Sequence, residues 1–141
     1  MKTLLTGILV LLLGCGGGKE LAESSKKMPQ KPKKVVVEMG FDRKTDDFTI
    51  TGASVTGTIL SVDVQYSGGC KDHAFELFTD GSIMKSLPPK QSFFLRHYAN
   101  EESCEALIQE KLLFDLSGST TQGNSLIILL EGFKGDLKMD F

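Results

Sequence analysis

The sequence lacks the features that mark several large classes of protein. It has no tryptophan, two histidines and three cysteines in 141 residues, and its formal net charge is −2. A charge this near balance does not suggest a nucleic-acid binder, so we expect no nucleic-acid partner. The length excludes a large multidomain enzyme, and the absence of an internal repeat excludes collagen-like and coiled-coil proteins.

No apolar run is long enough to span a membrane. The longest runs from Leu4 to Leu13 and is interrupted by Thr6 and Gly7. A spanning helix needs about 20 apolar residues, roughly twice this length. With Lys2 before it, the run is typical of the apolar region of an export signal. Residues 1–14 are therefore predicted to be a signal peptide.

The segment Leu12-Leu13-Gly14-Cys15 closes this run and resembles the lipobox of bacterial lipoproteins. The resemblance implies cleavage before Cys15, a diacylglycerol on its sulfur and usually a third acyl chain on its amine. Two or more chains anchor a protein stably to a membrane. Gly16 follows where an aspartate retains many lipoproteins in the inner membrane, so the expected location is the cell envelope, and the outer membrane in a Gram-negative source.

Residues 15–34 are predicted to be the lipidated cysteine and a flexible tether. Glycines, Pro29 and Pro32 disfavour regular structure, and few apolar residues are present to form a core. Six lysines and two glutamates give residues 16–34 a charge of +4, whereas nine basic and sixteen acidic residues give residues 35–141 a charge of −7. The basic segment is interpreted mainly as a solvated spacer, with contact to anionic headgroups as the alternative.

Residues 35–141 are predicted to form one β domain. Leu60, Val62, Val64 and Tyr66 alternate with polar residues, which is typical of a half-buried strand. The apolar run 125–130 indicates a strand buried on both faces or at the centre of a sandwich. Further strands are expected at 35–40, 46–52, 73–79, 91–98, 106–116 and 137–141.

The fold class follows from the spacing of these segments. Strands about 8–15 residues apart, bounded by glycine, proline, aspartate, asparagine or serine, favour an all-β fold. We predict a small antiparallel β-sandwich of about seven or eight strands, Greek-key or immunoglobulin-like, with a barrel as the alternative. The apolar residues of segment 106–116 also suit a helix. The parity shared by Ile108, Leu112, Phe114 and Leu116 favours a strand.

Both histidines and both remaining cysteines are predicted to gather at one end of the sheet. If strands 73–79 and 91–98 form a hairpin with pairs 77/93, 75/95 and 73/97, then His73 lies directly across from His97. Cys70 precedes the first strand and Cys104 follows the second after a short acidic loop. Glu101, Glu102 and Glu105 in that loop are interpreted as solvated.

Two chemistries fit this cluster. A disulfide between Cys70 and Cys104 suits the oxidising space outside the cytoplasm and could stabilise by about 4 kcal/mol. Alternatively, Cys70, His73, His97 and Cys104 form a tetrahedral set suited to zinc or copper. The two exclude each other, since an oxidised pair supplies no thiolate. We expect the disulfide and no cofactor, with Zn or Cu as the alternative.

A second resemblance covers residues 64–117. The run Gly68-Gly69-Cys70-Lys71-Asp72-His73-Ala74-Phe75-Glu76-Leu77, with the later His97, Cys104 and Phe114-Asp115-Leu116-Ser117, is similar to a group of small uncharacterised bacterial envelope proteins. That group brings no known activity. The resemblance implies only that the four cysteine and histidine residues act as a unit.

Catalysis is not expected, because no segment resembles a nucleophile elbow or a protease signature. By exclusion, the sequence favours an envelope lipoprotein that acts as a non-catalytic binding or structural module. Its expected contacts are the membrane, through Cys15, and an envelope protein or wall polymer. The alternatives are the zinc- or copper-binding module and an inhibitor of an envelope-targeting hydrolase.

Overall fold

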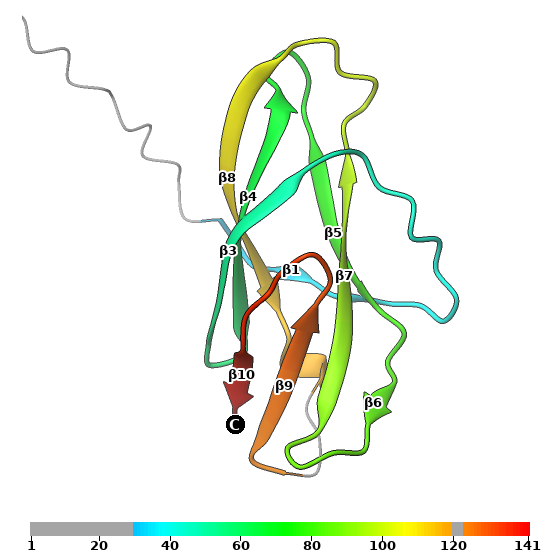
Figure 1. The fold of residues 1–141 in the computed structure, drawn as a ribbon, viewed down its shortest axis with the longest axis vertical. Coiled ribbons are helices and arrows are strands. Elements are labelled where there is room, and N and C mark those ends of the chain that lie inside the picture. Colours follow the sequence, from blue (N-terminus) through cyan, green and yellow to red (C-terminus); the bar gives the residue numbers. More distant parts are fainter. Residues whose placement is uncertain (1–29, 120–122) are drawn as a thin grey trace, which may run out of the picture.

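The computed structural model describes residues 30–119 and 123–141, which form ten strands and one short 3-10 turn (Figure 1). Cys15 and the predicted signal peptide lie outside the described residues. In chain order the elements are β1 (Lys33–Lys34), β2 (Val36–Val37), β3 (Thr49–Thr56), β4 (Ile59–Gly68), β5 (Ala74–Thr79), β6 (Ile83–Met84), β7 (Lys90–Tyr98), β8 (Ala106–Asp115), η1 (Ser117–Ser119), β9 (Ser125–Leu130) and β10 (Leu137–Asp140).

The strands form two sheets. One has the order β1-β8-β4-β3 and the other β10-β9-β7-β5-β2, while β6 pairs with β7 outside that path. The predicted all-β sandwich is confirmed, and neither sheet closes into a barrel. The sheets are mixed, however, because β1 pairs with β8, β2 with β5 and β7 with β9 in parallel. All other pairs are antiparallel among the described residues.

One hydrophobic core lies between the sheets. Alternate residues of β4, including Leu60 and Val62, meet Phe93 and Leu95 of β7, and each is at most 2% exposed. Burying a side chain of this kind stabilises by about 1.5–3 kcal/mol, so the alternation sets which face of each strand points inward. Within the described residues, no helix is long and apolar enough to cross a membrane.

Two of the strand predictions that left alternatives open have clear outcomes. Residues 106–115 form strand β8, as the parity of their apolar residues indicates. The run 125–130 forms β9, but it alternates: Leu126 and Ile128 are buried, whereas Leu129 is exposed. The prediction of a strand buried on both faces is therefore wrong, because the outer face of this sheet is open at Leu129.

A short segment links the two sheets along one side. Lys33 and Lys34, which the sequence analysis assigned to the tether, pair with Phe114 and Asp115 of β8. Two residues later, β2 pairs with the end of β5 in the other sheet. Lys33 also donates from Nζ to the carbonyl of Phe75 (3.2 Å). The chain therefore joins the sandwich slightly earlier than residue 35.

The hairpin formed by β5 and β7 has a different register from the predicted one. Phe75 pairs with His97 and Leu77 with Leu95, so the true pairs are offset by two residues from 75/95 and 73/97. A shift of two keeps every side chain on its face, because side chains alternate with a period of two. The hydrophobic pattern cannot distinguish these registers. His73 lies just before β5, in the loop that follows β4.

The segment between β2 and β3 crosses the outer face of the second sheet. Phe41 packs against Phe78 and Phe94, with ring centroids 5.4 and 5.8 Å apart. The guanidinium of Arg96 lies 4.3 Å from the ring centroid of Phe78 and donates to the carbonyl of Asp42. This cover buries Phe78 and Phe94, although both point away from the core.

Candidate functional site

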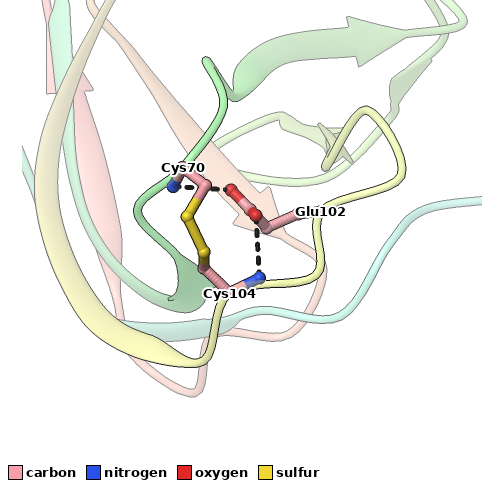
Figure 2. Close-up of side chains that lie close together, drawn as sticks. All are labelled: Cys70, Glu102 and Cys104. Carbon is pink, nitrogen blue, oxygen red and sulfur yellow. Dashed lines mark hydrogen bonds between the residues drawn. A yellow bond between two sulfur atoms is a disulfide. The ribbon is translucent and has the colours of Figure 1, made fainter.

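Two loops meet at one end of the sandwich, the upper end in Figure 1. The first joins β4 to β5 (residues 69–73), and the second joins β7 to β8 (residues 99–105). A disulfide between Cys70 and Cys104 links them, with Cα atoms 5.8 Å apart (Figure 2). We call this region the disulfide end. The bond encloses the whole β5–β7 hairpin, since the two cysteines are 34 residues apart.

The carboxylate of Glu102 ties the same two loops by accepting four backbone hydrogen bonds. Its Oε2 accepts from the N–H groups of Cys70 (3.0 Å) and Lys71 (2.8 Å). Its Oε1 accepts from those of Ser103 (2.9 Å) and Cys104 (2.8 Å). Figure 2 shows the carboxylate facing the backbone of both cysteines. These bonds, with that from Cys104 the strongest, lower the pKa of Glu102 from 4.5 to about 2.

The tip of the β7–β8 loop is held in an uncommon backbone shape. Asn100 and Glu101 have φ angles of 53° and 54°, which is the left-handed region that costs a non-glycine residue about 1–2 kcal/mol. Lys71 Nζ donates to both of their carbonyls (2.9 and 2.8 Å), and the Asn100 side chain donates to the carbonyl of Asp72. Contacts from the neighbouring loop therefore fix a shape that local preferences disfavour.

Both histidines are buried below these loops and contact each other. His73 Nδ1 lies 2.7 Å from His97 Nε2, and the two rings are nearly parallel with centroids 5.0 Å apart. The ring of Tyr66 stacks on His73 and that of Phe75 on His97. The His73 side chain and the His97 residue are each only 2% exposed. The pair belongs to the aromatic end of the core.

The partners of each ring assign its protons. The carbonyl of Asp47 can only accept, so His97 donates to it from Nδ1 (3.1 Å) and its Nε2 accepts from His73 Nδ1. His73 Nε2 lies 3.4 Å from Glu102 Oε2, which also accepts. The contacts of the His97 ring are therefore satisfied when His97 is neutral and carries its proton on Nδ1. Burial lowers the pKa of His97, and His73 lowers it further, in agreement with this assignment.

Gly68 leaves the space that the His73 ring occupies. A Cβ atom built on Gly68 would lie 2.6 Å from His73 Nε2, closer than any normal contact. Gly69 follows with a φ of 117°, which side-chain-bearing residues rarely adopt. The glycine pair therefore turns the chain out of β4 and admits the imidazole.

The four predicted residues gather at one end, but not as a set of four metal ligands. Cys70 and Cys104 are joined as a disulfide, and both nitrogens of His97 face His73 and Asp47. The two sulfurs and a Glu102 oxygen lie within 4.8 Å of one another. A zinc or copper site on the four residues stays a prediction, which requires a reduced disulfide and a rotated His97.

The acidic loop was only partly predicted. Glu101 and Glu105 are exposed, as expected of a solvated loop. Glu102 is the exception, since its side chain is 4% exposed and holds four backbone N–H groups. The prediction of a solvated Glu102 is therefore wrong. Its proximity to Cys104 in the sequence is the only available signal, because the partner N–H groups of Cys70 and Lys71 belong to a distant segment.

An open depression of about 570 Å³ lies beside these loops. His97 and Cys104 contribute to its lining together with Ser67, Ala99 and Ser103, and no lysine or arginine is part of it. The acidic residues Asp47, Glu102 and Glu105 complete the lining. The depression is wide rather than enclosed, so its geometry suits a side chain or loop of a partner better than a small molecule held on all sides.

Comparisons with known proteins reveal the fold of the chain and no family. No protein-family model matches, and no curated protein matches in sequence. Among solved structures, a NigD-like immunity protein from Bacteroides caccae is similar, with a TM-score of 0.57 and 17% identity over 72% of this chain and 53% of that one. The chain therefore spans about half the length of this neighbour.

Two further structures have the same architecture. A protein named as toxin-related from Parabacteroides distasonis gives a TM-score of 0.54 at 16% identity, over 78% of this chain and 60% of its own. A protein of unknown function from Bacteroides vulgatus gives 0.53 at 13% identity, over 78% and 56%. Identities this low support a shared β-sandwich and nothing finer.

Proposed function

We propose that the chain is a lipid-anchored protein of the bacterial envelope whose sandwich binds a protein partner without catalysis. The binding element is the loop of residues 99–105, which the disulfide and Glu102 hold in a fixed shape. A preformed loop loses little conformational entropy on binding, so it favours affinity. The single observation that carries this proposal is the Glu102 carboxylate with its four backbone donors.

The same observation argues against catalysis at this site. Histidine, glutamate and cysteine are the residue types of many active sites, but a catalytic group must be able to reach a substrate. Here both oxygens of the Glu102 carboxylate accept hydrogen bonds from backbone N–H groups, and the two cysteines form a disulfide. His73 and His97 are buried, and their nitrogens contact each other, Asp47 and Glu102. The cluster is suited to support a loop rather than to react.

The lipid anchor rests on the sequence. The lipobox at Leu12-Leu13-Gly14-Cys15 supports acylation of Cys15, and the structural neighbours come from bacteria of the genera Bacteroides and Parabacteroides. The expected measurement is intact mass of the full-length protein extracted from membranes. Acyl chains on the first residue of the mature chain support the proposal, and their loss in Cys15→Ser is the matched control. An unmodified Cys15 in the native protein overturns the anchor.

Photo-crosslinking in the native envelope tests the binding loop. A photoreactive residue at the exposed Glu101 position of the full-length chain should capture one protein reproducibly, identified by mass spectrometry. The control places the same group at Gln109, which is also exposed but points from β8 on another face. Capture should be lost in the Cys70→Ser, Cys104→Ser variant. Equal capture at positions 101 and 109, or adducts with wall polymer alone, contradicts the proposal.

A second candidate is an inhibitor of an envelope-targeting enzyme. One structural neighbour is named as an immunity protein, and a rigid projecting loop is well suited to occupy another protein's cleft. This candidate predicts that the partner captured at position 101 is a hydrolase and that the purified full-length protein lowers its activity. Full activity of a captured hydrolase in the presence of excess protein excludes it.

A further inference from the structure

Exposed apolar side chains gather at a corner of the second sheet far from the disulfide end. The described residues include eight large apolar side chains that are exposed. Five of them lie in two short segments: Val37, Met39, Ile83, Met84 and Leu87. Met39 is 88% exposed and Leu87 is fully exposed. We call these five residues the apolar corner.

Backbone contacts bring the two segments together. Between Val37 and Met39, the N–H of Glu38 donates to the carbonyl of Thr79, at the end of β5. A Cβ on Gly81, just before β6, would lie 3.3 Å from the Val37 side chain. The segment of Val37 and Met39 therefore approaches the chain just before β6, although more than forty residues separate the two segments in the sequence.

The projecting part of this surface is a hairpin. Strand β6 pairs with the start of β7, Ile83 opposite Gln91 and Met84 opposite Lys90, so residues 85–89 form its tip. Leu87 lies in that tip with its whole side chain open to solvent. In Figure 1, β6 lies low on the right, at the opposite end from the loops that carry the disulfide.

The hairpin is basic in an acidic domain. Residues 81–91 contain Lys85 and Lys90 and no acidic residue, whereas residues 35–141 as a whole carry a charge of −7. Apolar side chains flanked by lysines are the combination that binds the headgroup region of anionic bilayers. Ile83, Met84 and Leu87 have this combination with Lys85 and Lys90, whereas Glu38 stands between Val37 and Met39.

The length of chain before the sandwich limits how far the domain can move from a membrane. From Cys15 to the start of β1 at Lys33 there are eighteen residues, which span at most about 60 Å when fully extended. A domain held within this distance samples the bilayer surface at high effective concentration. Even a weak surface affinity would then keep the apolar corner on the membrane.

We propose that the apolar corner docks the sandwich on the headgroup region of an anionic bilayer, with Leu87 inserted and with Lys85 and Lys90 on the phosphates. The disulfide end then points away from the membrane, towards a partner. This inference rests on the proposed lipid anchor at Cys15, and it adds an orientation that the anchor alone does not give.

The test uses the absence of tryptophan from the native chain. Leu87→Trp in the full-length, acylated protein introduces a single fluorophore at the hairpin tip. In vesicles of phosphatidylcholine and phosphatidylglycerol, its emission should move to shorter wavelength. Lipids brominated about 5–10 Å below the headgroup boundary should quench it. The matched control is Leu107→Trp, another exposed apolar position that lies on β8 at the disulfide end and should stay unquenched.

A charge reversal tests the lysines. Lys85→Glu with Lys90→Glu, in the Leu87→Trp background, should abolish quenching, whereas Lys134→Glu in the β9–β10 connection should not. Equal quenching at positions 87 and 107 contradicts the orientation. If brominated lipids do not quench the fluorophore of Leu87→Trp, the proposal is overturned. This holds whether or not iodide, a water-soluble quencher, reaches that fluorophore. A fluorophore that neither brominated lipid nor iodide quenches would show that a second copy of the chain covers the apolar corner instead.

The anchor and the docking surface can fail separately. Intact mass of the same sample reports acylation of Cys15, whatever the fluorescence shows. An acylated Leu87→Trp protein whose fluorophore stays unquenched retains the anchor and loses the docking surface. An unacylated Cys15 overturns the anchor. Quenching at position 87 in a Cys15→Ser, Leu87→Trp chain mixed with the same vesicles would show that the surface binds lipid without it.

Discussion

The two ends of the sandwich differ in how their side chains are partnered. At the disulfide end, two loops carry many polar and charged groups, and a covalent bond, a carboxylate with four donors and a histidine pair hold them together. At the other end, the β6–β7 hairpin has a two-residue strand and a tip with an exposed Leu87. The first end uses its reactive groups to fix a shape, whereas the second leaves apolar groups uncovered.

The contrast teaches that residue type alone does not reveal a reactive site. Cysteine, histidine and glutamate lie together at the disulfide end, yet each has its partners. The residues that lack cover are ordinary apolar ones at the corner of the second sheet. Substitutions at the disulfide end should therefore cost more stability than substitutions at the apolar corner.

Removal of the disulfide should have the largest effect on stability. Cys70→Ser with Cys104→Ser opens a loop between residues 34 positions apart, and the chain-entropy model gives a loss of about 4 kcal/mol. Urea denaturation of the variant measures it. The companion test is alkylation of the unsubstituted protein after denaturation. Two reactive thiols in that test would show that the bond is not a main constraint. A loss of stability below about 1 kcal/mol in the variant would show the same.

The close fit between Gly68 and His73 predicts the next effect. Gly68→Ala places a Cβ 2.6 Å from His73 Nε2, so the ring must leave its contacts with His97 and Glu102. Overpacking of this kind costs about 1–3 kcal/mol. Gly118→Ala is the matched control, since no atom lies within 4 Å of its added Cβ. Denaturant midpoints that fall equally for both variants would contradict the role assigned to Gly68.

Acid should loosen the disulfide end in two stages. The folded pKa of His97 lies below 6.5, so the unfolded chain takes up a proton first and stability falls as the pH drops below about 6.5. The pKa of Glu102 is lowered from 4.5 to about 2, so its contribution is present above pH 4.5 and is lost towards pH 2.

Denaturation midpoints recorded from about pH 8 down to about pH 2 measure this dependence. His97→Gln should flatten the first stage, because it removes the group that titrates, and Glu102→Gln should flatten the second. A native protein whose stability rises on acidification from pH 7 to pH 5 would contradict the assignment of a neutral His97.

The smallest effect on stability is expected at the opposite end. Leu87 is fully exposed, so Leu87→Ser removes no buried contact and should change the free energy of unfolding by no more than about 0.5 kcal/mol. In a Cys15→Ser chain, which lacks the lipid anchor, the same substitution should reduce sedimentation with anionic vesicles. A large loss of stability would show that the tip is packed against the domain.

The sequence predicts most of the fold because the strands are half-buried. Alternation in Leu60, Val62 and Val64 reports directly on which face meets the core. The same pattern carries no information on a shift of two residues, so the register of Phe75 with His97 could not be read from it. The two-residue strand β1 forms by parallel pairing with a distant partner, and no local signal marks it, whereas β2 lies within the strand predicted at 35–40.

The cysteines, the histidines and the disulfide of the site were predicted, but the role of Glu102 was not. Cysteines and histidines are rare enough in this chain that their spacing draws notice, and the structure brings Cys70, His73, His97 and Cys104 to one end. Glu102 is one of many acidic residues, and its role depends on N–H groups supplied by a loop about thirty residues away. Only the folded chain distinguishes it from Glu101 and Glu105.

Amide hydrogen exchange of the native protein, compared with Glu102→Gln and Glu105→Gln, tests the central claim most directly. If the Glu102 carboxylate fixes the recognition loop, the N–H groups of Cys70, Lys71 and Cys104 are protected in the native protein. They exchange quickly in Glu102→Gln and keep their protection in Glu105→Gln. Fast exchange of these three groups in the native protein, or unchanged protection in Glu102→Gln, would contradict the claim that this carboxylate braces the loop.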